Sequence, residues 1–397
     1  MRLIHVTALV LLAATGAAAQ TIPSEPITFG EGRVVLSGDA SLSISPTDEG
    51  FFNYSNYEQT TLRQFSVGMT GLFRLSDRLS LLGELRSDNL EYVTALALYA
   101  RIRPIPDKQL DIQIGRIPPT FGSFSRRGYG HDNPLIGIPL AYQYLTSLRA
   151  DNAPADADEL LRMRGRGWLS NFSVGNVRPE PGVPLVSSLT WDTGVQISSR
   201  WRMITATAAV TNGTASNPRV SDDNSGKQFA ARVTASPTIG LTIGGSFARG
   251  EFLGRQVRSL LPAGDRDYDQ RAGEIDVEYS RGHLLVRAET ALSSWRMPIG
   301  TSGAAMDLRS TATTVEGRYA FAPGWYAATR VEHLGFNRIA GATQTDEWEA
   351  PVTRVEAGGG YYVQRNLIAK AALQINRRDG GRVTRSQLLA VQLLYWF

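Results

Sequence analysis

The last twelve residues, SQLLAVQLLYWF at positions 386–397, show a period of two along the chain. In a β-strand successive side chains point to opposite sides, so residues two apart share a face. The segment therefore predicts a strand with one strongly apolar face that ends on an aromatic residue. The residues on that face are Leu389, Val391, Leu393, Tyr395 and Phe397.

The same period of two dominates the chain from residue 33 onward, with no helical stripe of comparable strength. Leu36, Ala40 and Leu42, for example, alternate with Asp39 and Ser41. The pattern predicts an all-β fold of sixteen strands. The candidate strands are 33–45, 61–75, 78–88, 91–103, 109–117, 184–198, 201–212, 226–236, 239–250, 268–281, 283–294, 311–321, 324–336, 349–363, 366–377 and 386–397.

Short and long connections alternate between these strands. Tight turns are expected at 76–77, 104–108, 199–200, 237–238, 282, 322–323 and 364–365. Long polar links are expected at 46–60, 118–183, 213–225, 251–267, 295–310, 337–348 and 378–385, and the link at 89–90 is the one short exception. This asymmetry is typical of a transmembrane antiparallel up-and-down β-barrel with short periplasmic turns and long external loops.

Composition is compatible with such a barrel and argues against other classes. The 397 residues include no cysteine, which excludes disulfides and thiolate metal sites. The 41 basic and 37 acidic side chains are interleaved, whereas nucleic-acid binding usually needs a clustered basic face. The mean hydropathy of −0.17 argues against a helical membrane protein, but half of each barrel strand is polar.

Residues 1–19 are expected to form a secretory signal peptide. Arg2 precedes an apolar core, and Ala17 and Ala19 form a small-residue cleavage site that would leave Gln20 as the first mature residue. The alternative, a transmembrane anchor, needs a longer apolar run. The expected location is therefore the outer membrane of a Gram-negative-type bacterium, with 20–32 as a short periplasmic segment and 33–397 as the barrel.

Charged residues recur in pairs, two apart, on one face of successive strands. In a soluble β-sandwich this face would be the solvated exterior, whereas in a membrane barrel it would line a wet interior. Opposite charges on adjacent strands stabilise one another across the ladder. The residues expected to line the lumen are Arg232, Glu274, Asp276, Glu278, Arg287, Glu289, Glu316, Arg318, Arg330, Glu332, Arg354, Glu356 and Lys370.

Two features carry a family resemblance. The terminal Phe397 after an alternating strand resembles the end of bacterial outer-membrane barrels, where the barrel-assembly machinery reads it together with neighbours such as Tyr395. The G-R-x-x-x-x-F-G stretch at 115–122, with Asn212-Gly213, the 227–237 strand and the final Trp-Phe, is similar to porins of the phosphate-selective O and P type. The resemblance implies a sixteen-stranded channel that is often trimeric.

In that family the loop between strands five and six folds into the lumen, and 118–183 occupies this position in the predicted strand order. Its mixed charges would create a transverse field that filters polar solutes. The residues expected at this constriction are Arg126, Arg127, Asp132 and Arg149. The alternative is an exposed loop that never enters the barrel.

Two departures from the family limit what the resemblance implies. Such pores are expected to be rich in lysine, but Lys108, Lys227 and Lys370 are the only lysines here, so phosphate selectivity is not expected. Family trimers often use the second external loop as a latch, and here that link is a short turn at 87–90. A homotrimer is therefore left open.

Two other function classes compete with a channel. A barrel hydrolase would have to use His131 and Asp132, with Ser123 and Ser125 nearby, but residues adjacent in sequence are not expected to point at one another as a base and its orienter must. A non-conducting barrel could act as an adhesin, receptor or structural anchor. The acidic run 151–159 could bind Ca²⁺ but lacks EF-hand spacing.

The sequence thus predicts an outer-membrane porin for passive diffusion of small hydrophilic solutes or ions. No catalysis, cofactor, metal or nucleic-acid partner is expected. The expected partners are outer-membrane lipid, the barrel-assembly machinery and the solutes themselves.

Overall fold

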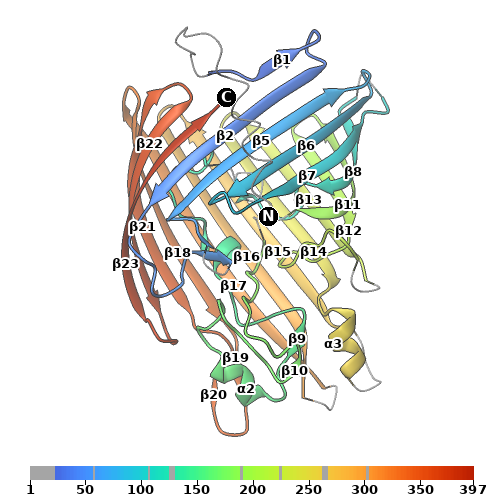
Figure 1. The fold of residues 1–397 in the computed structure, drawn as a ribbon, viewed down its shortest axis with the longest axis vertical. Helices are drawn as coiled ribbons and strands as arrows, with labels where there is room; N and C mark the ends of the chain where they lie inside the picture. Colours follow the sequence, from blue (N-terminus) through green and yellow to red (C-terminus); the bar gives the residue numbers. More distant parts are fainter. Residues whose placement is uncertain are drawn as a thin grey trace, which may run out of the picture.

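The computed structural model describes residues 23–56, 59–105, 108–124, 130–187, 191–222, 226–261, 267–300 and 304–397. Within these ranges sixteen antiparallel strands pair in sequence order and close into one barrel (Figure 1). The predicted fold class is confirmed. The expected signal peptide lies outside the described residues, as do Arg126, Arg127 and Ser125.

The barrel strands follow the alternation of the sequence. They are β2 (Val34–Ile44), β5 (Gln64–Arg74), β6 (Leu79–Asp88), β7 (Tyr92–Ile102), β8 (Leu110–Ile117), β11 (Asp192–Trp201), β12 (Ile204–Thr211), β13 (Gln228–Thr238), β14 (Leu241–Glu251), β15 (Asp269–Arg281), β16 (Leu284–Ile299), β17 (Ala304–Ala322), β18 (Trp325–Phe336), β21 (Val352–Gln364), β22 (Leu367–Arg378) and β23 (Arg385–Trp396).

The barrel closes where the last strand meets the first. β23 pairs with β2 from Asp39 to Ile44, and Phe397 exchanges two backbone hydrogen bonds with Gly38, of 2.9 and 3.1 Å. Beyond that point β1 (Ile27–Phe29) pairs with the first three residues of β2. The edge of β2 that faces the seam is therefore covered by β23 and then by β1, which the sequence did not predict as a strand.

The remaining elements are short. They are β3 (Tyr54–Asn56), β4 (Gln59–Thr60), α1 (Leu140–Gln143), β9 (Asn152–Ala153), α2 (Ala157–Arg162), β10 (Val174–Gly175), α3 (Arg255–Leu260), β19 (Arg338–Ala340) and β20 (Thr345–Glu347). Figure 1 shows α2, α3, β9, β10, β19 and β20 together at one end of the barrel, opposite β1 and the C-terminus. Of the described helices, none is both long and apolar enough to cross a membrane.

The two faces of the strands have opposite chemistry. On β18, Val331 is 50% exposed on the outside, whereas its neighbours Arg330 and Glu332 are at most 1% exposed on the inside. Leu373 on β22 and Leu389 on β23 are likewise exposed on the outside of the barrel. The barrel therefore carries its apolar side chains outward and its charged side chains inward.

Two predicted boundaries were wrong. Residues 184–187 were expected to begin a strand, but Leu185 and Val186 are buried in the interior, and β11 begins only at Asp192. Residues 295–310 were expected to be a long link, but β16 and β17 continue through most of it. The reason is burial: the inward-facing Trp295 and Met297 are completely buried against the interior segment described below.

The short link between β6 and β7, the exception in the expected alternation, is confirmed. Asn89 and Leu90 have φ values of 53° and 59°. A tight two-residue hairpin turn that matches the twist of antiparallel strands needs both of its residues in the left-handed conformation.

Candidate functional site

The described residues between β8 and β11 fold against the inner side of the barrel and over the end where α2, β9 and β10 lie. Tyr142, Leu148 and Leu160 belong to the same buried apolar cluster as Trp295 and Val352, which come from β16 and β21. Burial of such side chains stabilises a fold by about 1.5–3 kcal/mol each. This described part of the segment, residues 130–187, is here called the interior segment.

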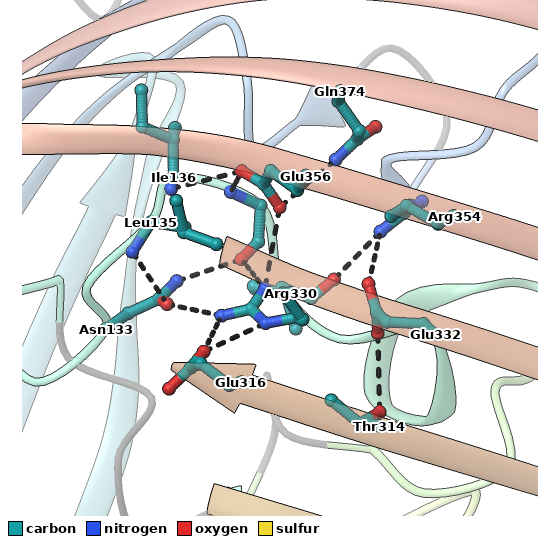
Figure 2. Close-up of polar contacts among 12 residues, drawn as sticks. Asn133, Leu135, Ile136, Thr314, Glu316, Arg330, Glu332, Arg354, Glu356 and Gln374 are labelled. Carbon is teal, nitrogen blue, oxygen red and sulfur yellow. Dashed lines mark hydrogen bonds and ion pairs between the residues drawn. The ribbon is translucent and has the colours of Figure 1, made fainter. Parts of the chain in front are cut away.

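Four charged residues form a checkerboard on the inner face of two adjacent strands. Arg330 and Glu332 on β18 lie directly opposite Glu356 and Arg354 on β21. All four side chains are fully buried. Figure 2 shows them around the extended backbone that leads into α1, and we call them the charge cradle.

The charge cradle binds this backbone through both its donors and its acceptors. Arg330 donates to the carbonyl of Gly137 at 2.7 Å, and the carboxylate of Glu356 accepts from the Gly137 amide at 2.9 Å (Figure 2). Glu332 accepts from the amide of Leu140 at 2.7 Å, and Arg354 donates to the carbonyl of Ile138 at 3.0 Å. Charge-assisted bonds of this kind are about twice as strong as neutral ones.

Further contacts secure the segment on either side of the cradle. The ammonium group of Lys370 on β22 donates to the carbonyl of Asn133 at 2.7 Å. Tyr142 donates its hydroxyl to Glu289 on β16, and burial raises the pKa of Tyr142 well above its usual value.

The end of the barrel where α2, β19 and β20 lie is here called the loop end. Two more carboxyl groups hold the segment there. Glu349, between β20 and β21, accepts from the amide of Ser147 at 2.8 Å. Burial raises the pKa of Glu349, although its hydrogen bonds act to lower it. Asp158 on α2 accepts from the amides of Ala342 and Thr343, at 3.0 and 3.2 Å.

The interior segment separates two cavities of unequal size, and Phe124, just before it in the chain, lines both. The smaller cavity, of about 150 Å³, lies against β13–β17 and is lined by residues that include Arg232, Asp276, Glu278, Arg287 and Glu289. The larger, of about 380 Å³, lies against β2, β5, β6, β7 and β23. The interior segment is thus anchored to one wall and leaves the opposite wall open.

The larger cavity has a polar lining along that open wall. Its strand residues include Asp39, Ser41, Ser43, Gln64, Ser66, Arg86, Asp88, Thr94 and Gln392. The guanidinium of Arg86 lies 4.0 Å from the carboxylate of Asp39 and 3.6 Å from that of Glu84. None of these residues was predicted to line the lumen, although their alternating polar positions on β2, β5 and β6 carried the signal.

The predicted lumen residues divide into two groups. Glu289, Arg330, Glu332, Arg354, Glu356 and Lys370 contact the interior segment, as described above. The others pair with neighbouring strands: Arg232 with Glu274 and Asp276 at 2.8 and 2.7 Å, Arg287 with Glu278 and Glu316 at 2.7 and 3.2 Å, and Arg318 with the ring of Tyr326.

Of the predicted constriction residues, Arg126 and Arg127 lie outside the described residues, and Asp132 and Arg149 have separate partners. Asp132 contacts His131, whereas Arg149 is buried within the interior segment and donates to Asp151 and to two backbone carbonyls. Of the predicted assembly residues, Phe397 closes the seam, and Tyr395 donates its hydroxyl to the carbonyl of Pro23.

The structure does not bring together all the residues that a barrel hydrolase would use. His131 Nε2 and the Asp132 carboxylate lie 3.6 Å apart, which is longer than the hydrogen bond that a base and its orienter need. Ser123 donates its hydroxyl to Glu289 at 2.7 Å, and the His131 ring stacks on Trp396. Among the described residues no group of His, Asp or Glu side chains is arranged to hold a metal ion.

No family model and no curated protein matches the chain. Solved structures of outer-membrane proteins, a porin among them, do. OmpF of Salmonella typhi, in complex with daunomycin, has a TM-score of 0.57 at 12% identity and covers 92% of this chain and 97% of that one. The anion-selective porin of Comamonas acidovorans has a TM-score of 0.55 at 9% identity, covering 92% and 99%. OmpT of Vibrio cholerae has 0.56 at 11%, covering 94% and 100%. The chain has the fold of porin-like outer-membrane barrels.

Proposed function

We propose that the protein is an outer-membrane porin through which small hydrophilic solutes or ions diffuse passively. The observation that carries the proposal is the cavity of about 380 Å³ that the interior segment leaves open along β2, β5, β6, β7 and β23, where polar side chains line the strands. In this proposal the interior segment is the constriction, and its attachment to the opposite wall sets the width of the passage.

The distribution of side chains supports the membrane setting. Apolar residues such as Ile275, Leu292 and Val331 are exposed on the outer face, where a soluble protein would lose stability and lipid would cover them. Ion pairs such as Arg232 with Glu274 face inward, where a channel interior is wet. Export by a cleaved signal peptide and insertion by the barrel-assembly machinery are part of this proposal.

The charged lining of the passage argues for a weak preference for cations. Asp39 and Asp88 contribute two carboxylates, and Arg86 contributes one guanidinium. A lining of this composition does not suit a phosphate-selective channel of the O and P type, so we propose a general diffusion channel instead.

Assembly is a separate part of the proposal. One of the similar structures is described as a trimer form of OmpT of Vibrio cholerae. A trimer of this chain would need contacts other than a latch between β6 and β7, because that link is a tight turn at Asn89 and Leu90. Analytical ultracentrifugation of the detergent-solubilised protein distinguishes a trimer from a monomer.

The deciding experiment is single-channel recording of the refolded protein in a planar lipid bilayer. Discrete open-channel steps are expected. Their absence, in protein whose circular dichroism spectrum shows a folded barrel, would contradict the channel and favour an adhesin, receptor or structural anchor.

A barrel hydrolase is the second candidate, on the observation that His131 and Asp132 contact each other. Esterase and protease assays of the wild type and the His131→Ala variant test it. Activity that the variant loses would favour the hydrolase, whereas equal activity in both would remove it.

A further inference from the structure

Arginine side chains line up on the outer face of the barrel near its loop end. The register places Arg249 on β14 directly opposite Arg271 on β15, which in turn lies opposite Ser294 on β16. Ser294 lies opposite Arg309 on β17, and Arg296 is two residues further along β16. We call Arg249, Arg271, Arg296 and Arg309 the arginine row.

The stability of the sheet does not account for this arrangement. Like charges directly opposite each other on neighbouring strands are destabilising. Asp269 offsets part of the repulsion, since its carboxylate lies 2.6 Å from Arg249 and 3.7 Å from Arg271. Both guanidinium-bearing side chains are still about half exposed, at 49% and 59%, so they remain accessible from outside.

The arginine row borders the exposed apolar surface of the same strands. Phe247 precedes Arg249 by two residues on β14, and Leu292 precedes Ser294 by two on β16, with exposed fractions of 47% and 54%. On β15, Ile275 lies on the same outer face as Arg271, with Gly273 between them, and is 70% exposed. A lipid whose chains covered these residues would place its headgroup beside the arginines.

A hollow in the surface lies at this level. It has a volume of about 280 Å³ and is lined by Asp269, Arg271, Ser294, Arg296, Ala305 and Asp307. The four guanidinium groups of the row lie near three carboxylates, Asp267, Asp269 and Asp307, and Glu251 beside them pairs with Arg258. The surplus of positive charge, in a geometry that lets several arginines reach one group, favours an anion with several oxygens.

We propose that the arginine row binds the phosphorylated headgroup of a lipid in the leaflet on the loop side. The guanidinium groups would bind the phosphate oxygens, and the acyl chains would lie over Phe247, Ile275 and Leu292. The proposal rests on the proposed membrane setting but not on conduction.

Native mass spectrometry of the refolded protein in neutral detergent tests the proposal, with lipid A as the probe. The test variant is Arg271→Gln with Arg309→Gln. The matched control is Arg281→Gln, because Arg281 lies on the same strand and the same outer face as Arg271, at the opposite end of the apolar belt. Lipid affinity is expected to fall about tenfold or more in the double variant, as loss of two charged phosphate contacts implies, and to stay unchanged in the control.

Three results would overturn the proposal: equal affinity in all variants, equal binding of dephosphorylated lipid A, or displacement of the lipid by millimolar inorganic phosphate, which would indicate a site for a free anion. Bilayer recording separates this failure from that of the channel. Open-channel steps without lipid binding would refute the lipid site alone, and lipid binding without steps would refute the channel alone.

Discussion

Arg330 and Glu356 lie opposite each other on β18 and β21, with 3.5 Å between their charged groups, and each binds one backbone group of Gly137. Because both are fully buried, neither charge is stabilised by water. Their mutual attraction and their bonds to the interior segment replace that hydration. The ion pair and the docked segment therefore depend on one another.

Neutralising one member of this pair should loosen the interior segment. In Glu356→Gln the Gly137 amide loses a charged acceptor and Arg330 keeps a buried charge with less compensation. Breaking a buried pair costs about 3–5 kcal/mol. We expect a lower midpoint of thermal unfolding and larger, noisier conductance steps in bilayer recordings. The control is Glu278→Gln, a carboxylate with 40% of its side chain exposed, which should leave both unchanged. A quiet, wild-type conductance in Glu356→Gln would contradict the role of the cradle.

A side chain at Gly137 should displace the segment by steric contact. A Cβ atom there would lie 2.5 Å from a carboxylate oxygen of Glu356 and 2.7 Å from the amide nitrogen of Gln374. Gly137→Val is therefore expected to change the single-channel conductance. Gly273→Val is the matched control, because a Cβ at Gly273 meets no atom within 4 Å. Identical conductance in the two variants would show that the segment does not set the passage width.

Charge selectivity should depend on the open wall. The double variant Asp39→Asn, Asp88→Asn removes two carboxylates from the cavity lining and leaves Arg86, with Glu84 at 3.6 Å, at this wall. Reversal potentials in a potassium chloride gradient should shift from a cation toward an anion preference, and the shift should shrink at high salt as the charges are screened. The same measurement on Glu278→Gln, which lines the smaller cavity, should show little change. A larger shift in that control would place the passage on the other side of the segment.

Low pH should release the contact between α2 and the turn after β19. Desolvation acts to raise the pKa of Asp158, but the hydrogen bonds from Thr343 and Ala342 together outweigh it and hold the pKa below its ordinary value. A lowered folded-state pKa stabilises this contact above the unfolded value, and the stabilisation is lost as the pH falls through the folded value. Hydrogen-exchange protection of the Ala342 and Thr343 amides should therefore fall in acid. In Asp158→Asn that acid-dependent loss should disappear; if it persists, another group controls the turn.

The sequence predicts the strands of the barrel wall better than the interior segment that packs against them. Period two identifies Arg330 and Glu332 as inward and Val331 as outward, because a strand's geometry is local. The partner of Arg330, Gly137, is 193 positions away in a stretch without periodicity, so no local pattern links them. Asp39 and Arg86 were recognisable as polar positions of strands, but which wall stays open depends on where the segment docks. Trp295 was assigned to a link because its burial depends on that same docking.

The seam between β2 and β23 has a consequence for how the molecule is made. The interior segment precedes β18, β21 and β22, the strands that bind it, and the last pairing joins residues as far apart as Gly38 and Phe397. Contacts of such long sequence separation form slowly, because the entropy of loop closure is lost before they contribute. The segment is hydrogen-bonded to β18, β21 and β22, so we expect it to dock as these strands pair, before the seam closes. Substitutions in the charge cradle should therefore slow assembly as well as alter the finished channel.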